Sequence, residues 1–272
     1  MSPLTGLDVA GKTDPGCVRA NNEDSLAVMA ELGLLVVADG MGGHSSGEVA
    51  SSIATETLKE FARKMLGGER QILPEGGDPS KPPRARQLEY LIKTANTMIF
   101  EKARAFPKDH GMGTTIVAAL LDERSMTVAH VGDSRLYILR GGKLQVMTDD
   151  HSLVMDQVKR GLISPEEAEK SAIQNILTRA LGTEAEVVVD VEEHPLLEGD
   201  VVMLCSDGLT KRVSEAESAK AMLSSSTASE MCDRLIEMAR AAGGTDNITV
   251  VAARIGQQGS GLRKLFAKLF GK

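Results

Sequence analysis

The sequence LLVVADGMGGH, residues 34–44, joins an apolar run to a glycine-rich turn through an aspartate. The short apolar run Leu34–Ala38 is typical of a buried β-strand. Asp39 and Gly40 follow directly, so the strand ends at a carboxylate beside a residue that has no side chain. Glycine at such a position lets backbone carbonyls and waters approach closely. The stretch therefore predicts a buried strand that places Asp39 at the edge of a sheet.

Four other aspartates stand at the ends of expected strands. Asp133 and Asp207 each follow one, Asp246 precedes the last one, and Asp24 lies just before another. A single Asp-Gly pair is most often a solvated turn. Several carboxylates at strand ends favour a hard divalent cation such as Mg²⁺ or Mn²⁺, which prefers oxygen ligands. We interpret the set as a candidate metal site.

Along the rest of the chain, strands occur in runs and helices occur in pairs. Strands are expected near residues 7–9, 26–28, 114–121, 127–131, 135–139, 144–147, 186–192, 200–205 and 248–253, and helices over 46–64, 85–105, 151–160, 165–171, 215–223 and 228–242. Because strands and helices do not alternate strictly, the pattern indicates an α+β fold with antiparallel sheets flanked by helix pairs. No repeat is visible, and one domain is expected over residues 1–256.

Composition limits the functions that are open to the chain. It has 272 residues, of which 42% are hydrophobic and 25% are charged, and its formal net charge is −7. This composition excludes intrinsic disorder, and no apolar run approaches the roughly 20 residues of a membrane-spanning helix. An acidic chain with few aromatic residues argues against general nucleic-acid binding. The first residues lack the features of a secretory signal, and Cys17, Cys205 and Cys232 are widely spaced, so we expect a cytoplasmic protein with reduced thiols.

Two other patterns suggest different activities. Residues 6–13, GLDVAGKT, match the phosphate loop of nucleotide hydrolases, but the strand before it and the helix after it that this loop requires are missing. Residues 43–47, GHSSG, match the nucleophile elbow of serine hydrolases, yet Ser45 lies well beyond the strand end at Ala38. An acyl-transferring hydrolase is therefore the alternative enzyme class, and labelling of Ser45 by a fluorophosphonate probe would support it.

Seven short motifs carry a more specific signal. They are DPGCVRANNED (14–24), DGMGGH (39–44), GTT (113–115), GDSR (132–135), TRALG (178–182), SDGL (206–209) and DNIT (246–249). In this order they resemble the bacterial metal-dependent protein phosphatases, the type 2C Ser/Thr family, over about residues 6–255. The resemblance implies an αββα sandwich: two antiparallel sheets packed face to face, helix pairs outside, and a binuclear metal centre at one end.

The resemblance also implies a reaction and roles for the motif residues. Asp39 would bridge two Mn²⁺ or Mg²⁺ ions, and the Gly40 carbonyl would complete one coordination shell. Asp207 and Asp246 would hold the first ion. A hydroxide bridging the two metals would then hydrolyse phosphoserine or phosphothreonine in a protein substrate, opposing a bacterial Ser/Thr kinase.

Further roles follow from the same resemblance. Glu23 and Asp24 would orient waters around the second ion, and Arg19 would bind the substrate phosphate with its planar guanidinium. Asp133 would line a third, weaker metal position. The family often has an acidic residue where this chain has Lys211, and an ammonium group there puts the occupancy of that third position in doubt.

Some of these residues have simpler interpretations. The alternative for Arg19 is a surface ion pair with Asp14 or Glu23. For Cys17, a small buried thiol is favoured over an oxidation-sensitive one. Met41 stands where many eukaryotic members have a histidine, so leaving-group protonation would fall to a metal-bound water, and aryl phosphates should be hydrolysed readily. A catalytically silent scaffold that binds phosphoproteins is the alternative from a different functional class.

Two segments lie outside the expected catalytic core. Residues 151–173, which we call the flap segment, stand where bacterial members carry a mobile flap, and Gly161 and Pro165 break their helical pattern. Residues 257–272 form a linker and a tail in which apolar residues recur at helical spacing opposite basic ones. Such a tail can pack on the protein, dock into a partner groove or lie on the inner membrane surface. We expect a monomer.

Overall fold

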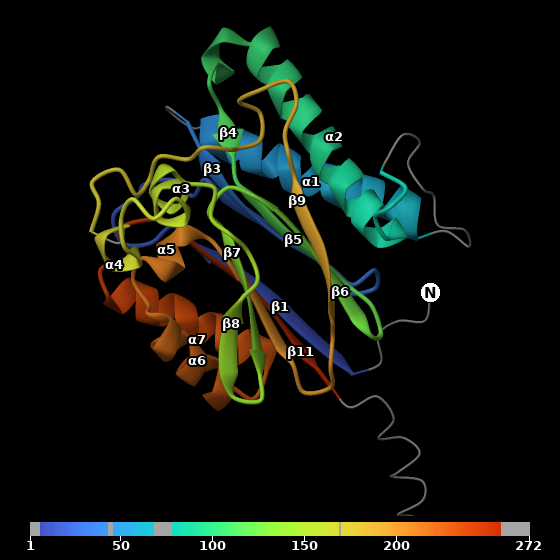
Figure 1. The fold of residues 1–272 in the computed structure, drawn as a ribbon, viewed down its shortest axis with the longest axis vertical. Helices are drawn as coiled ribbons and strands as arrows, with labels where there is room; N and C mark the ends of the chain where they lie inside the picture. Colours follow the sequence, from blue (N-terminus) through green and yellow to red (C-terminus); the bar gives the residue numbers. More distant parts are fainter. Residues whose placement is uncertain (1–5, 43–45, 68–77, 169, 257–272) are drawn as a thin grey trace, which may run out of the picture.

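The computed structural model describes residues 6–42, 46–67, 78–168 and 170–256. The strands are β1 (Leu7–Asp14), β2 (Asp24–Met29), β3 (Leu34–Met41), β4 (Gly113–Thr114), β5 (Ile116–Leu121), β6 (Ser125–Val131), β7 (Arg135–Arg140), β8 (Lys143–Val146), β9 (Asp190–Pro195), β10 (Val201–Cys205) and β11 (Ile248–Ile255). The helices are α1 (Ser46–Leu66), α2 (Pro83–Ala105), α3 (Leu153–Lys159), α4 (Pro165–Ala168), α5 (Asp207–Thr210), α6 (Glu215–Ser224) and α7 (Ala228–Ala241), with a 3₁₀ turn at Pro107–Asp109. Figure 1 shows these elements along the chain.

The strands form two antiparallel sheets. One has the order β1-β11-β10-β7-β8, and the other has the order β2-β3-β5-β6-β9, with β4 paired to the end of β3. β1 pairs with β11 along its whole length, from Leu7 opposite Ile255 to Asp14 opposite Ile248. Nearly all of the sequence that matches a phosphate loop therefore lies in a β-strand, which excludes that function.

Helix pairs cover the outer faces of the two sheets, α1 and α2 on one side and α6 and α7 on the other (Figure 1). Alternation along β3 defines the layers: Leu34 and Val36 pack toward α1 and α2, whereas Leu35 and Val37 pack toward the other sheet. A third core cluster joins that other sheet to α6 and α7. Because both faces of β3 are covered, its apolar run is continuous, and the predicted αββα sandwich is confirmed. None of the helices in the described part of the chain combines the length and apolarity needed to cross a bilayer.

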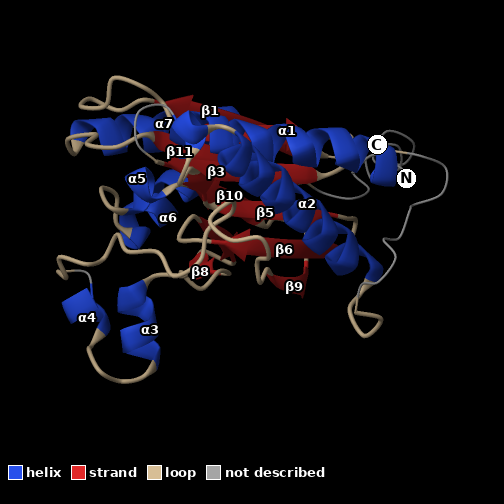
Figure 2. Ribbon diagram, turned by 90° about the horizontal axis from the view of Figure 1, so that it is seen from above, coloured by secondary structure: helices blue, strands red, loops and turns tan. Residues whose placement is uncertain are grey.

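The flap segment, with α3 and α4, stands out from the side of the layers (Figure 2). At its base the Leu153 N–H donates to the Ile176 carbonyl at 2.8 Å. Gly161 has a φ of 69°, a conformation that favours glycine, and it lies between the two short helices. The predicted breaks at Gly161 and Pro165 are thus confirmed, but the helix predicted over 165–171 is assigned only to Ala168.

One strand lies further along the chain than its sequence predicts. Three consecutive valines favour a strand over 186–192, but β9 spans Asp190–Pro195. Val188 is exposed, whereas Val189 packs into the core with the outer helix pair. The valines therefore anchor a loop beside the helices. β9 itself is a polar edge strand, and a polar edge strand carries little strand propensity.

Candidate metal centre

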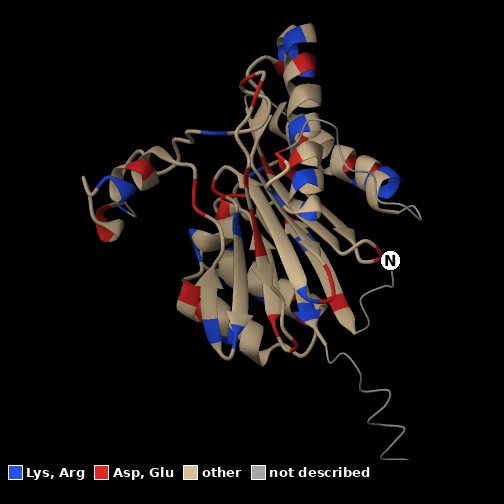
Figure 3. Ribbon diagram, turned by 45° about the vertical axis from the view of Figure 1, so that its right-hand side comes forward, with Lys and Arg blue, Asp and Glu red and all other residues tan. Residues whose placement is uncertain are grey.

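The five aspartates predicted at strand ends lie at one edge of the sandwich. Asp24 opens β2 and is the register partner of Asp39 near the end of β3. Asp133 follows β6, Asp207 is the first residue of α5, and Asp246 lies two residues before β11. In Figure 3 acidic positions, in red, gather at the loops at this end of the strands. The structure thus brings together the whole set that the sequence analysis proposed.

Backbone hydrogen bonds fix the position of Asp39. Its carbonyl oxygen accepts from Thr114 Oγ1 at 2.9 Å and from the Thr115 N–H at 2.8 Å. Its own N–H donates to Thr115 Oγ1 at 3.1 Å, and that hydroxyl lies 2.7 Å from Ser134 Oγ. These contacts interrupt the predicted strand over 114–121, which becomes β4 and β5. The interruption is what holds the end of β3 at the site.

The carboxyl of Asp39 is surrounded by other carboxyls. Burial, together with the charges of Asp24, Asp207, Asp133 and Asp246, raises the pKa of Asp39 well above its ordinary range. Carboxylates this close repel one another strongly when they are desolvated. The site therefore favours either bound protons or added cations.

Asp24 has one satisfied and one unsatisfied oxygen. Its Oδ2 accepts from Ser206 Oγ at 2.7 Å and from Thr249 Oγ1 at 2.6 Å. Its Oδ1 is buried and has no hydrogen-bond partner among the residues that the structure describes. Burial raises the pKa of Asp24 to about 6, although the two hydroxyl donors act to lower it. A buried oxygen of this kind is costly unless a further ligand satisfies it.

Within the described residues, two basic side chains form ion pairs with this cluster. The Lys211 ammonium contacts Asp207, and Arg19 Nη2 donates to Asp246 Oδ2 at 3.0 Å. Burial and the neighbouring charge of Asp207 raise the pKa of Asp133 to about 7, and the nearby Lys211 offsets only part of this effect. The negative charge of the cluster is therefore only partly compensated.

Two glycines allow the backbone to pack tightly at the site. A Cβ atom at Gly40 would overlap the carbonyl oxygens of Gly47 and Glu23, and one at Gly208 would overlap that of Asn247. Any larger residue would push apart the loops that carry the carboxylates. Both glycines follow a site aspartate directly, as the sequence analysis anticipated for Gly40.

Asn247 is a positioning residue to which the sequence analysis gave no role. Its Oδ1 accepts from the Glu23 N–H at 2.8 Å. Its Nδ2 donates to the Pro15 carbonyl at 3.1 Å and to the Asn21 carbonyl at 2.9 Å. One amide thus joins the loop around Arg19 to the start of β11. In the sequence, Asn247 is visible only as part of an Asp-Asn pair directly before a buried strand. An ordinary turn has the same pattern, so the pair did not indicate this role.

The donor set fits hard divalent cations. Carboxylate oxygens of Asp39, Asp207 and Asp246, with the Gly40 carbonyl, are ligands of the type that Mg²⁺ and Mn²⁺ prefer. Two observations of this structure call for a cation: the raised pKa of Asp39 and the unsatisfied Oδ1 of Asp24. Glu23 lies at the rim, where burial raises its pKa and the nearby Arg19 lowers it.

Two single-residue interpretations need correction. The ion-pair partner of Arg19 is Asp246, whereas Asp14 pairs with Arg240. Cys17 is exposed, so its interpretation as a buried thiol is wrong: it lies in the loop after β1, where its thiol contacts only the Arg240 carbonyl at the end of α7 among the hydrogen bonds of the described residues. The serine-elbow residue Ser45 and the tail 257–272 lie outside the described residues.

Known proteins share both this sequence and this fold. Residues 18–248 match the family model described as Protein phosphatase 2C. The chain is 38% identical over 247 residues to the serine/threonine phosphatase stp of Listeria innocua, an alignment that covers 88% of this chain and 92% of the relative. The chain therefore belongs to the protein phosphatase 2C family, and the resemblance seen in the sequence is confirmed.

Solved structures of such relatives superpose closely. The crystal structure of the serine/threonine phosphatase PstP/Ppp of Mycobacterium tuberculosis gives a TM-score of 0.81 at 37% identity, covering 92% of this chain and 99% of that one. The catalytic domain of PstP in complex with two manganese ions gives 0.79 at 37% identity, with the same coverage. Stp1 of Staphylococcus aureus gives 0.83 at 34% identity, covering 94% and 98%.

Proposed function

We propose that this chain hydrolyses phosphoserine and phosphothreonine in proteins with the help of two Mn²⁺ or Mg²⁺ ions. The observation that carries the proposal is the convergence of four strand-end carboxyls around Asp39, one of them with a buried oxygen that has no partner within the described part of the chain. Relatives named as serine/threonine phosphatases, one solved with two manganese ions, support it.

The cluster offers a distinct task for each carboxylate. Asp39 is central and would bridge the two ions, with the Gly40 carbonyl beside it. Asp207 and Asp246 would hold the first ion, and Glu23 and Asp24 would bind the second through water. When bound, the two ions would lower the pKa of a water molecule between them and neutralise phosphoryl charge.

Arg19 would bind the substrate phosphate. Its guanidinium can donate two parallel hydrogen bonds to phosphoryl oxygens, which an ammonium group cannot do. The side chain is 53% exposed and already lies beside the cluster through Asp246. Substrate binding would therefore exchange a carboxylate oxygen for a phosphoryl oxygen, with little movement of the backbone.

A third, weaker metal position would lie at Asp133 and Asp207. The contact of Lys211 with Asp207 supports the expectation of weak binding, because an ammonium group next to a divalent cation repels it. Calorimetric titration with Mn²⁺ checks this directly. Three sites of similar affinity would contradict it.

Asp39→Asn tests the proposed function most directly. Asparagine keeps the size of the side chain but removes the central charge, so Mn²⁺ affinity and phosphopeptide hydrolysis should both fall, hydrolysis by at least about 100-fold. Asp149→Asn is the matched control, because that carboxylate pairs on the surface with Lys159. Equal rates of hydrolysis for wild type and Asp39→Asn would refute the mechanism. If the wild-type protein binds the phosphopeptide without hydrolysing it, the result would favour a catalytically silent scaffold.

We further propose that residues 1–256 act as a monomeric, cytoplasmic catalytic unit that opposes a bacterial Ser/Thr kinase. One chain supplies every carboxylate of the site, which supports a monomer, and light scattering of the purified protein checks it. The flap segment stands out from the side of the sandwich and would shape substrate choice.

The tail 257–272 would pack on the protein's own surface, dock into a partner groove or contact an anionic membrane surface. Its last eleven residues contain four basic and no acidic residues. Co-sedimentation with anionic liposomes, with and without residues 261–272, separates membrane contact from the other two: pelleting that depends on the tail supports the membrane contact, and no such pelleting supports packing on the protein or on a partner.

A further inference from the structure

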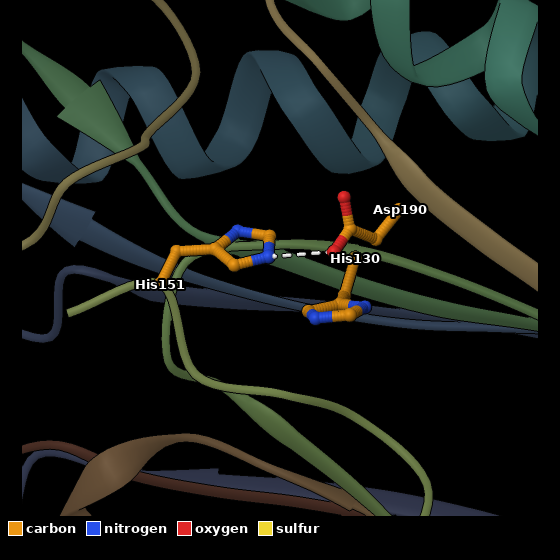
Figure 4. A group of neighbouring side chains, drawn as sticks. All are labelled: His130, His151 and Asp190. Atoms are coloured by element: carbon orange, nitrogen blue, oxygen red, sulfur yellow. Dashed lines mark hydrogen bonds and ion pairs between the residues drawn. The ribbon is translucent and has the colours of Figure 1, made fainter. Parts of the chain in front are cut away.

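A second group of titratable side chains lies outside the aspartate cluster (Figure 4). His130 on β6, His151 at the base of the flap segment and Asp190 on β9 each place one ligand-type atom within 4.8 Å of the others. The two imidazole rings stack with their centroids 4.6 Å apart. Two histidines and a carboxylate at such spacing resemble a zinc site.

The hydrogen bonds of His151 decide against a metal. The Gly132 N–H donates to Nδ1 at 3.1 Å, so the proton of the neutral ring is assigned to Nε2, which lies 3.1 Å from Asp190 Oδ2. A cation would have to displace that proton and would face Arg179, whose guanidinium donates to Asp190 at 2.6 Å. Burial and the nearby His130 lower the pKa of His151 to about 4, so the imidazole is neutral in solution.

His151 instead connects three separate segments. Its backbone N–H donates to the Gly132 carbonyl at 2.9 Å, and its backbone carbonyl accepts from the Thr178 N–H at 2.9 Å. The ring adds the bond from Gly132 and the bond to Asp190, and the residue is 2% exposed. Gly132 directly precedes Asp133, and Thr178 closes the base of the flap segment. The residue thus links the metal-centre loop, the flap base and the edge strand β9: its backbone bonds Gly132 and Thr178, and its ring bonds Gly132 and Asp190.

We propose that His151 is a positioning residue whose two ring nitrogens have separable roles. We call the hydrogen bond at Nδ1 the Nδ1 arm and the hydrogen bond at Nε2 the Nε2 arm. The Nδ1 arm holds the Gly132–Asp133 turn, which has a φ of 106° at Gly132. The Nε2 arm holds the base of the flap segment against Asp190, whose second partner, Arg179, comes from the far side of that base. The proposal rests on the proposed function, because it assigns the first arm to metal and phosphate chemistry and the second to protein-substrate binding.

Two substitutions separate the arms. Asparagine at position 151 can place an oxygen where Nδ1 accepts from Gly132, but it is too short to reach Asp190. Glutamine can place an N–H near Nε2 but offers no acceptor at the Nδ1 position. His151→Asn should therefore keep the turn and lose the flap contact, whereas His151→Gln should do the reverse. Asp190→Asn, on β9, weakens the same contact by removing its charge and also removes the ion pair with Arg179, so it should loosen the flap base at least as much as His151→Asn does.

Three measurements test the proposal on the full chain. Hydrogen exchange of the metal-free protein should show faster exchange over 151–178 for His151→Asn and Asp190→Asn, and over 131–134 for His151→Gln. With Mn²⁺, His151→Asn should raise KM for a phosphopeptide about 10-fold and leave aryl phosphate hydrolysis unchanged. His151→Gln should instead lower kcat about 10-fold for both substrates and weaken the weakest Mn²⁺ site seen by calorimetry.

His194→Asn is the control, because His194 lies four residues after Asp190 on β9 and pairs only with Glu192 among the ion pairs of the described residues. It should leave all three measurements unchanged. Two outcomes would overturn the proposal. In the first, His151→Asn and His151→Gln have identical effects that only follow a lower Tm, which would make His151 an ordinary core residue. In the second, both variants behave like the wild type. Hydrogen exchange needs no turnover, so an inactive wild type would refute the proposed function and leave the two-arm test standing.

Discussion

Asp133→Asn should stabilise the metal-free protein, and the gain should appear only above the ordinary pKa of an aspartate, where the unfolded wild-type chain loses the carboxyl proton. The pKa of Asp133 rises from its ordinary 3.8 to about 7, because the side chain is buried beside Asp207. A difference of one in pKa corresponds to about 1.4 kcal/mol, so ionisation costs the folded state up to about 4 kcal/mol. The value of about 7 already includes the relief from Lys211, so we expect a gain of about 2–4 kcal/mol, the lower end applying where the folded state relaxes around the charge.

The direction of the pH dependence follows from proton binding. Between pH 3.8 and about 7 the folded protein retains a proton on Asp133 that the unfolded chain has lost. Stability therefore falls as the pH rises through this window. Asparagine cannot ionise, so its advantage should be near zero at about pH 4 and complete above about pH 8, where Tm should rise by about 5–10 °C.

Thermal unfolding in EDTA, followed by circular dichroism across that pH range, measures the effect. Asp149→Asn is the control: its carboxylate is exposed and pairs with Lys159, so its removal should change stability by less than about 1 kcal/mol at any pH. Saturating Mn²⁺ should shrink the advantage of Asp133→Asn, because cations neutralise the repulsion. A gain of equal size at every pH, or no gain at high pH, would refute this electrostatic account of the cluster.

Three further substitutions test other parts of the site. Arg19→Lys should lower kcat/KM for a phosphopeptide about 10- to 100-fold and leave Mn²⁺ affinity within about twofold, since only the bidentate contact is lost; an unchanged rate would mean a surface ion pair. Gly208→Ala should weaken Mn²⁺ binding in calorimetry, because its Cβ would overlap the Asn247 carbonyl; wild-type affinity would show that the loops can shift. Ser206→Ala should cost about 1–3 kcal/mol in urea unfolding, because it removes a donor from the buried Asp24; a neutral effect would mean that water replaces the hydroxyl.

Much of the fold could be predicted from local sequence patterns. The apolar run Leu34–Ala38 and the helical spacing after residue 46 correspond to β3 and α1 in the structure. The Val-rich loop before β9 was misplaced, because residue type alone cannot show whether valines pair with a strand or pack under a helix. The exposure of Cys17 was missed for the same reason: burial depends on what covers a loop.

The candidate site divides in the same way. Its five aspartates were identifiable because each stands where a strand pattern stops, and the motif order associated them with Arg19 and Glu23. The roles of Asn247 and His151 were not identifiable, since each acts through hydrogen bonds to residues distant in sequence, such as the 2.8 Å bond from the Glu23 N–H to Asn247.

The sequence by itself determined where strands end and which of them end in a carboxylate, because alternation and apolar runs are local properties of the chain. The tertiary structure alone decided that these ends meet at one edge, which oxygen of Asp24 is left unsatisfied, and that Arg19 pairs with Asp246. The physical reason is that register and sheet-on-sheet packing set distances between segments, and charge repulsion, desolvation and hydrogen bonding depend on those distances.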